Sequence, residues 1–287
     1  MERLVFVNSD HGHREISRRE KLVENFYSSS CPNVETIVHQ AVSTKLSQTF
    51  ATIPATLRLF FHDCFAEGCD TSIMIASPKG DAEKDAQDNL SLAGDGFDTD
   101  QGKTSSRSSM HRCSIMCRHL GNCCKRYSSP GPSFSVELGR RDGRISLASC
   151  AAGNLAKPFF DLTRLNAIFV KNNLTQFDMI ALSGAHTVGV SHCNNVENRL
   201  CSFCPSSPVD PSRDPNHAQQ LMQDCPQNIG PTIVINVDPV TPGTFDNVYY
   251  QNLVARKGLF TSDQVLFTNP TSRPTVNDFA NNPNEFN

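Results

Sequence analysis

The chain has 287 residues, of which 38% are hydrophobic, and its formal net charge is −3. This length allows one large domain or two lobes around a shared cleft. The small negative charge argues against nucleic acid as the main partner, because phosphate backbones are bound by basic faces. No apolar run approaches the roughly 20 residues of a membrane-spanning helix.

Cysteine usage and the N-terminus point in different directions. Twelve cysteines indicate an oxidising compartment with disulfides, and Asn173-Leu174-Thr175 is a glycosylation sequon that suits secretion. The opening "MERLVFVNSDHGHREISRREKL" has only a four-residue apolar run before its charges, so we do not expect a signal peptide. Residues 1–21 are treated as an extension, and residues 22–287 as one domain.

Helical periodicity dominates the rest of the chain. Apolar residues recur at three- and four-residue steps over residues 34–46, 55–65, 162–173 and 244–259. Alternating strand patterns are scarce, so we expect an all-α fold with little β structure. Residues 100–129 differ, because they are rich in Ser, Arg and Cys and lack an apolar stripe. That composition is typical of disorder or of a basic loop, although such a long loop is unusual inside a compact domain.

A first cluster of polar residues lies in "ATLRLFFHDCFAEGCDTS". If residues 54–65 are helical, Arg58, Phe61 and His62 share one face. A cation, an aromatic ring and an imidazole together favour a pocket in which a proton moves and negative charge develops. The alternative is a core histidine beside a surface arginine.

The residues that follow supply many oxygen atoms on a short loop. Carboxylates, a hydroxyl and accessible carbonyls are ligands that Ca²⁺ prefers, and here they come from Asp63, Ala66, Gly68, Asp70 and Ser72, with Glu83 as a further ligand, through water. The spacing of Cys64 and Cys69 permits a disulfide across this loop. An acidic turn with two free thiols is one alternative.

Zinc is the other alternative for this loop, with His62, Cys64 and Cys69 as ligands. The paired Cys-x-x-Cys spacing of structural zinc sites is absent there. Cys201 and Cys204 do have that spacing, but no second pair accompanies them at an ordinary distance along the chain.

A second cluster lies in "DMIALSGAHTVGVSHC". His186 follows a helix-like run and is a candidate axial metal ligand, and Asp263 is a candidate acceptor for its other ring N–H. A histidine in a plain turn is the alternative. Further along the chain, "NVDPVTPGTFDN" is again rich in oxygen-bearing residues. With Thr187 they resemble a second Ca²⁺ cage, and they are Asp238, Thr241, Thr244 and Asp246.

With these residues in view, the chain resembles the plant secretory (class III) haem peroxidases, the family typified by horseradish peroxidase. The motifs "FYSSSCPNVETIV", "LRLFFHDCFAEGCDTSI", "EKDAQDN", "GRRDGR", "ALSGAHTVG", "DPVTPGTFDNVYY" and "KGLFTSDQ" occur in the order of that family. The resemblance runs from about Leu22 to the last residue, apart from residues 100–129. It implies an all-α, two-lobed fold with haem b between a distal and a proximal lobe.

The resemblance also implies roles for individual residues. His62 becomes the acid and base that moves the peroxide proton, Arg58 stabilises charge as the O–O bond breaks, and Phe61 screens the oxygen left on iron. Asn89 holds the distal imidazole in the required tautomer. His186 becomes the proximal iron ligand, with Asp263 giving it imidazolate character.

Two Ca²⁺ ions and two disulfides follow from the same resemblance. The distal Ca²⁺ takes the ligands of the first loop, and the proximal Ca²⁺ takes those around Thr187. The disulfides are Cys64–Cys69 and Cys193–Cys225. The implied partners are H₂O₂ and small phenolic donors. The resemblance also implies a monomer that works outside the cell or in the cell wall.

The chain departs from the family pattern in several places. Residues 100–129 stand where the family has a buried helix, and a further helix and a final Cys are expected after Asn287. The motif Asn-Leu-Pro-x-Pro at the substrate edge reads Asn154-Leu155-Ala156-Lys157-Pro158, which places Ala156 at the substrate-facing carbonyl. Because the predicted catalytic residues are present, we still expect a peroxidase. The alternatives are an inactive truncated or frame-shifted copy that cannot hold haem, and a Ca²⁺-binding wall protein without catalysis.

Overall fold

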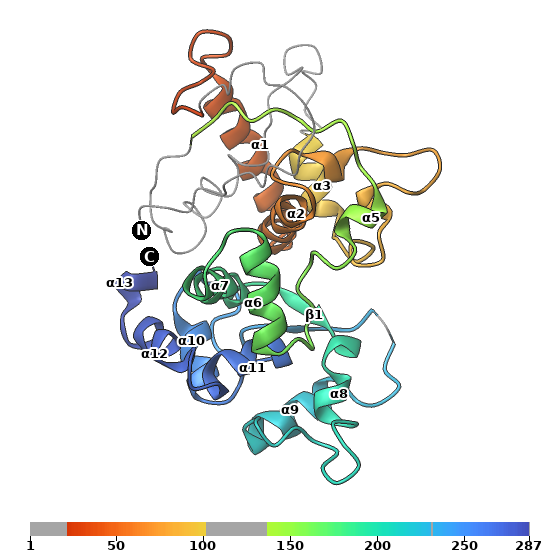
Figure 1. Cartoon of the computed structure of the whole chain (residues 1–287), viewed down its shortest axis with the longest axis vertical. Coiled ribbons are helices and arrows are strands. Elements are labelled where there is room, and N and C mark those ends of the chain that lie inside the picture. The colour runs from red at the N-terminus through yellow and green to blue at the C-terminus, as the bar shows by residue number, and fades with distance from the viewer. Residues whose placement is uncertain (1–21, 102–136, 231, 287) are drawn as a thin grey trace. The chain divides into compact units, whose positions relative to one another are not determined.

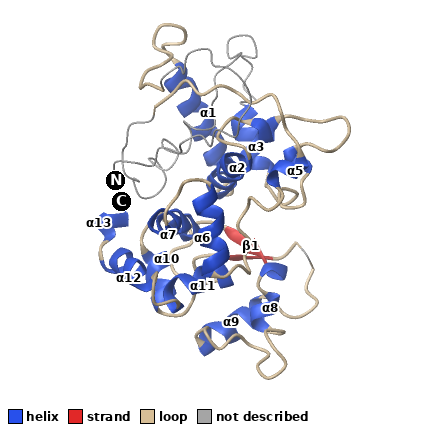
Figure 2. Cartoon of the chain, in the orientation of Figure 1, coloured by secondary structure: helices blue, strands red, loops and turns tan. Residues whose placement is uncertain are grey.

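The computed structural model describes residues 22–101, 137–230 and 232–286 (Figure 1). Helices dominate these residues, and the only sheet among them has two short strands (Figure 2). The expectation of a helical fold is therefore confirmed. No helix among them is long and apolar enough to cross a bilayer. The predicted extension at residues 1–21, and the unusual segment beyond Gln101, lie outside the described residues.

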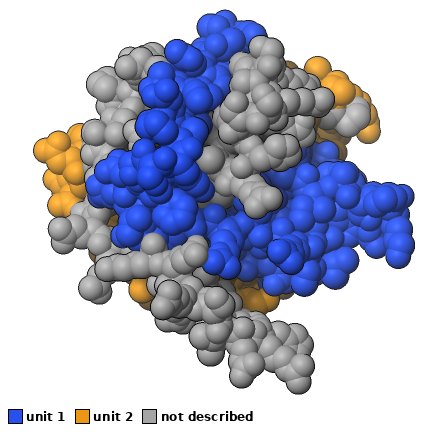
Figure 3. Space-filling model, turned by 90° about the horizontal axis from the view of Figure 1, so that it is seen from above, with its two compact units in different colours: residues 1–155 blue, residues 156–287 orange. Residues whose placement is uncertain are grey.

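The chain divides into two compact units, residues 1–155 and 156–287, which are coloured separately in Figure 3. The helical elements of the first unit are α1 (Val34–Gln48), α2 (Thr52–Ala66), α3 (Gly94–Gln101) and α5 (Ala148–Ala151), with 3₁₀ turns η1 (Ser72–Met74) and η2 (Glu83–Asp85). Helix α2 begins two residues before the predicted start, because Pro54 is tolerated in a first turn.

Close packing of α2 on α3 forms the centre of the first unit. Gly96 of α3 approaches the α2 backbone so closely that a Cβ there would lie 2.8 Å from the Ala55 carbonyl oxygen. Leu59 and Ile73 are buried beside this contact, with Phe60 and Phe97 packed around them. The buried side of α2 is thereby fixed, which determines where its polar residues point.

The second unit contains more and shorter elements. Its helices are α6 (Leu162–Lys171), α7 (Gln176–Ser183), α8 (Glu197–Leu200), α9 (Pro215–Asp224), α10 (Val248–Val254), α11 (Thr261–Thr268), α12 (Arg273–Asn281) and α13 (Pro283–Phe286), with 3₁₀ turns η4 (Gly184–Thr187) and η5 (Cys193–Asn195). Strands β1 (Val190–His192) and β2 (Val234–Asn236) pair antiparallel, with Ser191 opposite Ile235.

Helix α10 is shorter than the predicted range 244–259. At its start, the Thr244 carbonyl and the Asp246 carboxylate accept hydrogen bonds from the Thr187 hydroxyl, and Asp246 also accepts from the Val248 amide, so these residues form a loop. At its end, Arg256 adopts a positive φ of 60°, which stops a helix.

Candidate active site

The apolar helix α2 presents the first set of predicted catalytic residues. Arg58, Phe61 and His62 lie one turn apart on it, as predicted. The Phe61 ring stacks on Phe65, with 4.1 Å between the ring centroids. The Arg58 guanidinium is exposed and donates to both the carbonyl and the hydroxyl oxygen of Ser91, at 2.8 and 2.9 Å. Sequence reasoning did not find Ser91, because a serine in a loop carries no recognisable signal.

His62 is buried and bound by an amide. Its Nδ1 lies 2.6 Å from Asn89 Oδ1, and the Asn89 amide nitrogen donates to the Glu83 carbonyl, which fixes the orientation of the amide. Because the Asn89 oxygen can only accept, the imidazole proton sits on Nδ1 and Nε2 is left as the basic nitrogen. Burial, together with the nearby charge of Arg58, lowers the pKa of His62 to about 4. The ring is therefore neutral near pH 7.

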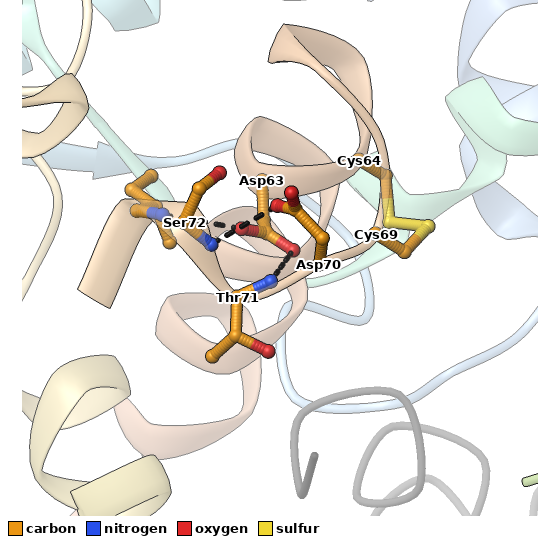
Figure 4. The surroundings of a disulfide bond; sticks show 7 residues. Asp63, Cys64, Cys69, Asp70, Thr71 and Ser72 are labelled. Atoms are coloured by element: carbon orange, nitrogen blue, oxygen red, sulfur yellow. Dashed lines mark hydrogen bonds between the residues drawn. A yellow bond between two sulfur atoms is a disulfide. The ribbon is translucent and has the colours of Figure 1, made fainter. Parts of the chain in front are cut away.

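The loop after α2 is closed by a disulfide between Cys64 and Cys69 (Figure 4). Both thiols are consumed in this bond, so the zinc alternative, which required them as ligands, is wrong. The carboxylate of Asp63 accepts from the amides of Thr71 and Ile73, and that of Asp70 accepts from the Ser72 amide. The loop thus folds around its own acidic side chains.

Negative charge is concentrated at this loop. The Ser72 hydroxyl lies 3.0 and 3.1 Å from the two carboxylate oxygens of Glu83, and both residues are fully buried. Burial first, and then the charges of Asp63 and Asp70, raise the pKa of Glu83 to about 7. The described residues contain no cluster of three His, Cys, Asp or Glu side chains arranged around a metal. A cation here would therefore rely on hydroxyl and carbonyl oxygens as well, and the donors fit Ca²⁺.

The second unit holds the other predicted histidine. His186 lies in η4, directly after α7, and its Nδ1 is 2.7 Å from Asp263 Oδ1. The same carboxylate accepts from the Tyr249 hydroxyl and the Phe260 amide. Burial alone would raise the pKa of Asp263, but the His186 imidazole and these two donors lower it.

The consequence for His186 is a defined tautomer. A carboxylate bound at Nδ1 leaves Nε2 as the nitrogen for a metal, and 41% of the side chain is exposed. Aromatic rings of Tyr249 and Phe260 stand edge-on to the imidazole, at 6.0 and 5.5 Å. Tyr249 was not predicted, because a tyrosine within an apolar helical pattern gives no sign that its hydroxyl meets a carboxylate.

A second oxygen-rich loop lies beside His186. The hydroxyls of Thr187 and Thr241 both donate to Asp246 Oδ1. Asp238 Oδ1 accepts from two backbone amides and from Asn252, whereas its Oδ2 is buried without a partner among the described residues. An orphaned buried carboxylate oxygen costs free energy unless a cation or water binds it. This loop therefore also fits Ca²⁺.

The second predicted disulfide and Ala156 both lie among the described residues. A disulfide joins Cys193 and Cys225 and is buried in a cluster with Val196, Leu200 and Leu221. Ala156 is half-buried and precedes the exposed ring of Phe159.

The two histidine pairs, His62 with Asn89 and His186 with Asp263, are the ones that the resemblance to the haem peroxidases implies. Comparison with known proteins agrees. Residues 38–282 match the family model described as Peroxidase. The chain is similar to Peroxidase 51 of Arabidopsis thaliana, with 54% identity over 92% of this chain and 82% of that protein. Peroxidase 55 and Peroxidase 3 of Arabidopsis thaliana are 54% and 40% identical over 93% and 90% of this chain.

This chain belongs to the peroxidase family. Its match spans most of the sequence and includes the motifs on both sides of residues 102–136. The expectation of a haem peroxidase is confirmed, and nothing in the comparisons favours the inactive alternative. Haem and calcium themselves follow only from the family.

Proposed function

We propose that the chain is a haem b peroxidase that uses H₂O₂ to oxidise small phenolic donors, with His62 as its acid and base and His186 as its iron ligand. The observation that carries this proposal is the opposite treatment of the two imidazoles. His62 is bound at Nδ1 by a neutral amide, and His186 by a carboxylate. One ring is thereby kept as a neutral base, and the other becomes an electron-rich ligand.

The distal residues move the proton of the peroxide. His62 Nε2 accepts it from one peroxide oxygen and returns it to the oxygen that leaves, and the Arg58 guanidinium stabilises the negative charge on that oxygen. Asn89 preserves the tautomer throughout, and Phe61 limits access to the reacting oxygen. Haem b, bound through His186 Nε2, supplies the iron that takes up the oxidising equivalents and passes them to the donor.

The two calcium ions have a structural role in this proposal. The distal ion uses the loop from Asp63 to Ser72, directly after the helix that carries His62. The proximal ion uses Thr187, the residue after His186, together with Asp238 and Asp246. Neutralising the charge of each loop keeps each histidine in place.

The donor and the location follow from the family and from the disulfides. Phenolic donors would be bound beside Ala156, where the backbone carbonyl is kept although the fixed φ of proline is missing. The two disulfides support an extracellular or cell-wall location, because such bonds persist in oxidising compartments.

The test is reconstitution of the full chain with haemin, Ca²⁺ and a glutathione redox couple, followed by peroxide-dependent oxidation of guaiacol. His186→Ala should lose the Soret band of bound haem. His62→Ala should keep that band but lose about 10²–10⁴-fold in its rate with peroxide. His192→Ala, a histidine of strand β1, is the matched control and should behave like the parent. Equal loss of haem in all three variants would contradict the assigned roles.

A further inference from the structure

Cys201 and Cys204 form a Cys-x-x-Cys pair for which the catalytic site has no use. Both are free thiols in the structure. Cys201 directly follows α8, where the chain turns, and the chain bends again at Phe203. Three residues of fully extended chain span at most about 11 Å. A disulfide requires roughly 4.4–6.8 Å between Cα atoms, so the connection between the two cysteines is long enough for the bond to form.

The surroundings of Cys204 favour a reactive sulfur. Its Sγ lies 3.4 Å from the Ser206 hydroxyl and 3.6 Å from the Ser207 carbonyl oxygen. Backbone hydrogen bonds in both directions between Cys204 and Ser207 close a tight turn that holds these groups in place. The Ser206 hydroxyl, with the backbone of Ser207 and Ser206, lowers the pKa of the Cys204 thiol. A larger fraction of thiolate makes a sulfur more reactive toward peroxide.

Cys201 has different surroundings. It is half-buried against the apolar cluster that contains the Cys193–Cys225 disulfide. Cys201 and Cys225 also line a common hollow of about 420 Å³ with Leu200, Pro208 and Met222. The two cysteines thus differ in their surroundings, and Cys201 is assigned the second step of disulfide formation, in which it attacks the oxidised Cys204.

The other two described free thiols, Cys31 and Cys150, have surroundings that make them less reactive toward peroxide than Cys204. Burial, together with the Glu67 carboxylate, raises the pKa of Cys150 to about 11, so this thiol stays protonated near neutral pH. Cys31 packs against the apolar cluster of Tyr27, Val34 and Val38. These two cysteines therefore serve as internal controls for the reactivity of the pair.

We propose that Cys201 and Cys204 are a dithiol that H₂O₂, the oxidising substrate of the peroxidase family, converts into an intrachain disulfide. The Cys204 thiolate attacks one peroxide oxygen, the O–O bond breaks, and the other oxygen leaves as water after taking a proton. The resulting sulfenic acid is attacked by the Cys201 sulfur, its S–O bond breaks, and a second water leaves. Two thiols lose two electrons and two protons, and one peroxide becomes two waters.

Trypsin offers a direct assay, because cleavage after Arg199 and Arg213 releases both cysteines on one peptide without any other cysteine. The haem-loaded full chain receives one equivalent of H₂O₂, then N-ethylmaleimide, and is digested without reduction. The peptide Leu200–Arg213 should be unalkylated and lighter by about 2 Da, the mass of the two hydrogens lost. Dithiothreitol should restore two alkylatable thiols, and Cys150 should remain alkylatable throughout.

Variants distinguish the attack by Cys204 from the attack by Cys201, and oxidation by H₂O₂ itself from oxidation through the haem site. In Cys204→Ser, loss of the Cys201 thiol should slow at least about tenfold. In Cys201→Ser, the single equivalent of H₂O₂ should leave Cys204 as the sulfenic acid, because no second thiol resolves it. The lighter peptide should also form in His186→Ala, which keeps this test independent of the proposed haem site.

Several results would overturn the proposal. One is a cross-link between Leu200–Arg213 and the peptide that carries Cys225, which would show exchange with the existing disulfide instead. Unchanged loss of the Cys201 thiol in Cys204→Ser would refute the order of attack. Formation of the lighter peptide only in the haem-loaded chain would mean that peroxide does not oxidise the pair directly.

Discussion

Two buried arginines of the second unit should respond in opposite ways to the same substitution. Arg199 and Arg213 are 1% and 2% exposed, and both donate to the Leu259 carbonyl. In Arg199, Nη1 also donates to the Gly258 and Phe260 carbonyls. Its Nε donates to the Asp210 carboxylate and its Nη2 to the Ser212 hydroxyl. Arg213 has Nε and Nη1 buried without a partner among the described residues. We therefore expect Arg213→Met to stabilise the protein and Arg199→Met to destabilise it.

The size of the effect follows from the cost of burying the charge. Burial, together with the nearby charge of Arg199, lowers the pKa of Arg213 from 12.5 to about 9. At about 1.36 kcal/mol per pKa unit, this shift corresponds to a cost of about 5 kcal/mol for the charged form. The shift to about 9 already includes the attraction of Asp210 and Asp263. Methionine gives up one charge-assisted hydrogen bond, worth about 1.5–3 kcal/mol. The expected net stabilisation is therefore about 2–3 kcal/mol.

The control removes a fully paired guanidinium. Arg199→Met removes the charged partner of the buried Asp210 carboxylate and the donor to the Gly258 and Phe260 carbonyls, which should cost about 3–5 kcal/mol. Urea unfolding at pH 7, with the disulfides intact and at fixed Ca²⁺, gives both changes from the midpoint and its slope. If Arg213→Met destabilised the protein by more than about 1 kcal/mol, the argument from the unpartnered nitrogens would be wrong.

Three further predictions concern the two halves of the site. The pKa of folded His62 is about 4, below the ordinary 6.5. The stability that the neutral ring contributes is therefore fully present above pH 6.5, and about 3 kcal/mol of it is lost as the pH falls to 4. The urea midpoints of the parent and of His62→Gln across this range should converge at low pH. Asp263→Asn should weaken haem binding or activity about 10–100-fold, measured by haemin titration, with Tyr249→Phe as the milder control. In Asp238→Asn the orphaned Oδ2 loses its charge. The variant should therefore unfold at a higher temperature than the parent in EGTA, and at a lower temperature in millimolar Ca²⁺. Equal shifts in both buffers would contradict calcium binding there.

The sequence predicted the elements whose signal is local. Helical periodicity located α1, α2 and α6 to within a few residues, and the spacing of Arg58, Phe61 and His62 placed them on one face. The pairing of His186 with Asp263 joins residues 77 positions apart, so the sequence offered Asp263 only as one candidate acceptor, and the resemblance to a family added the support. Local pattern alone carries no information about such a contact.

Other features depend on packing and had no signal in the sequence. Nothing in the sequence around Arg199 and Arg213 distinguishes buried guanidiniums from exposed ones, since arginine is mostly a surface residue. Their burial arises because the carbonyls at residues 258–260 point inward and need donors. The short span of α10 has a similar origin. Hydrogen bonds to Asp246 delay its start, and the positive φ of Arg256 stops it, against the apolar periodicity.

The two histidines also illustrate how one side chain can be adapted for two tasks by its acceptor alone. Each imidazole is held through Nδ1, which leaves Nε2 for chemistry. The amide of Asn89 offers no charge, so burial and Arg58 dominate and the pKa of His62 falls. The carboxylate of Asp263 brings a negative charge, which increases the electron density of His186 and suits it to bind a metal. Exchanging the two acceptors, with Asn89→Asp and Asp263→Asn, should therefore raise the pKa of the distal ring and weaken the proximal ligand at the same time.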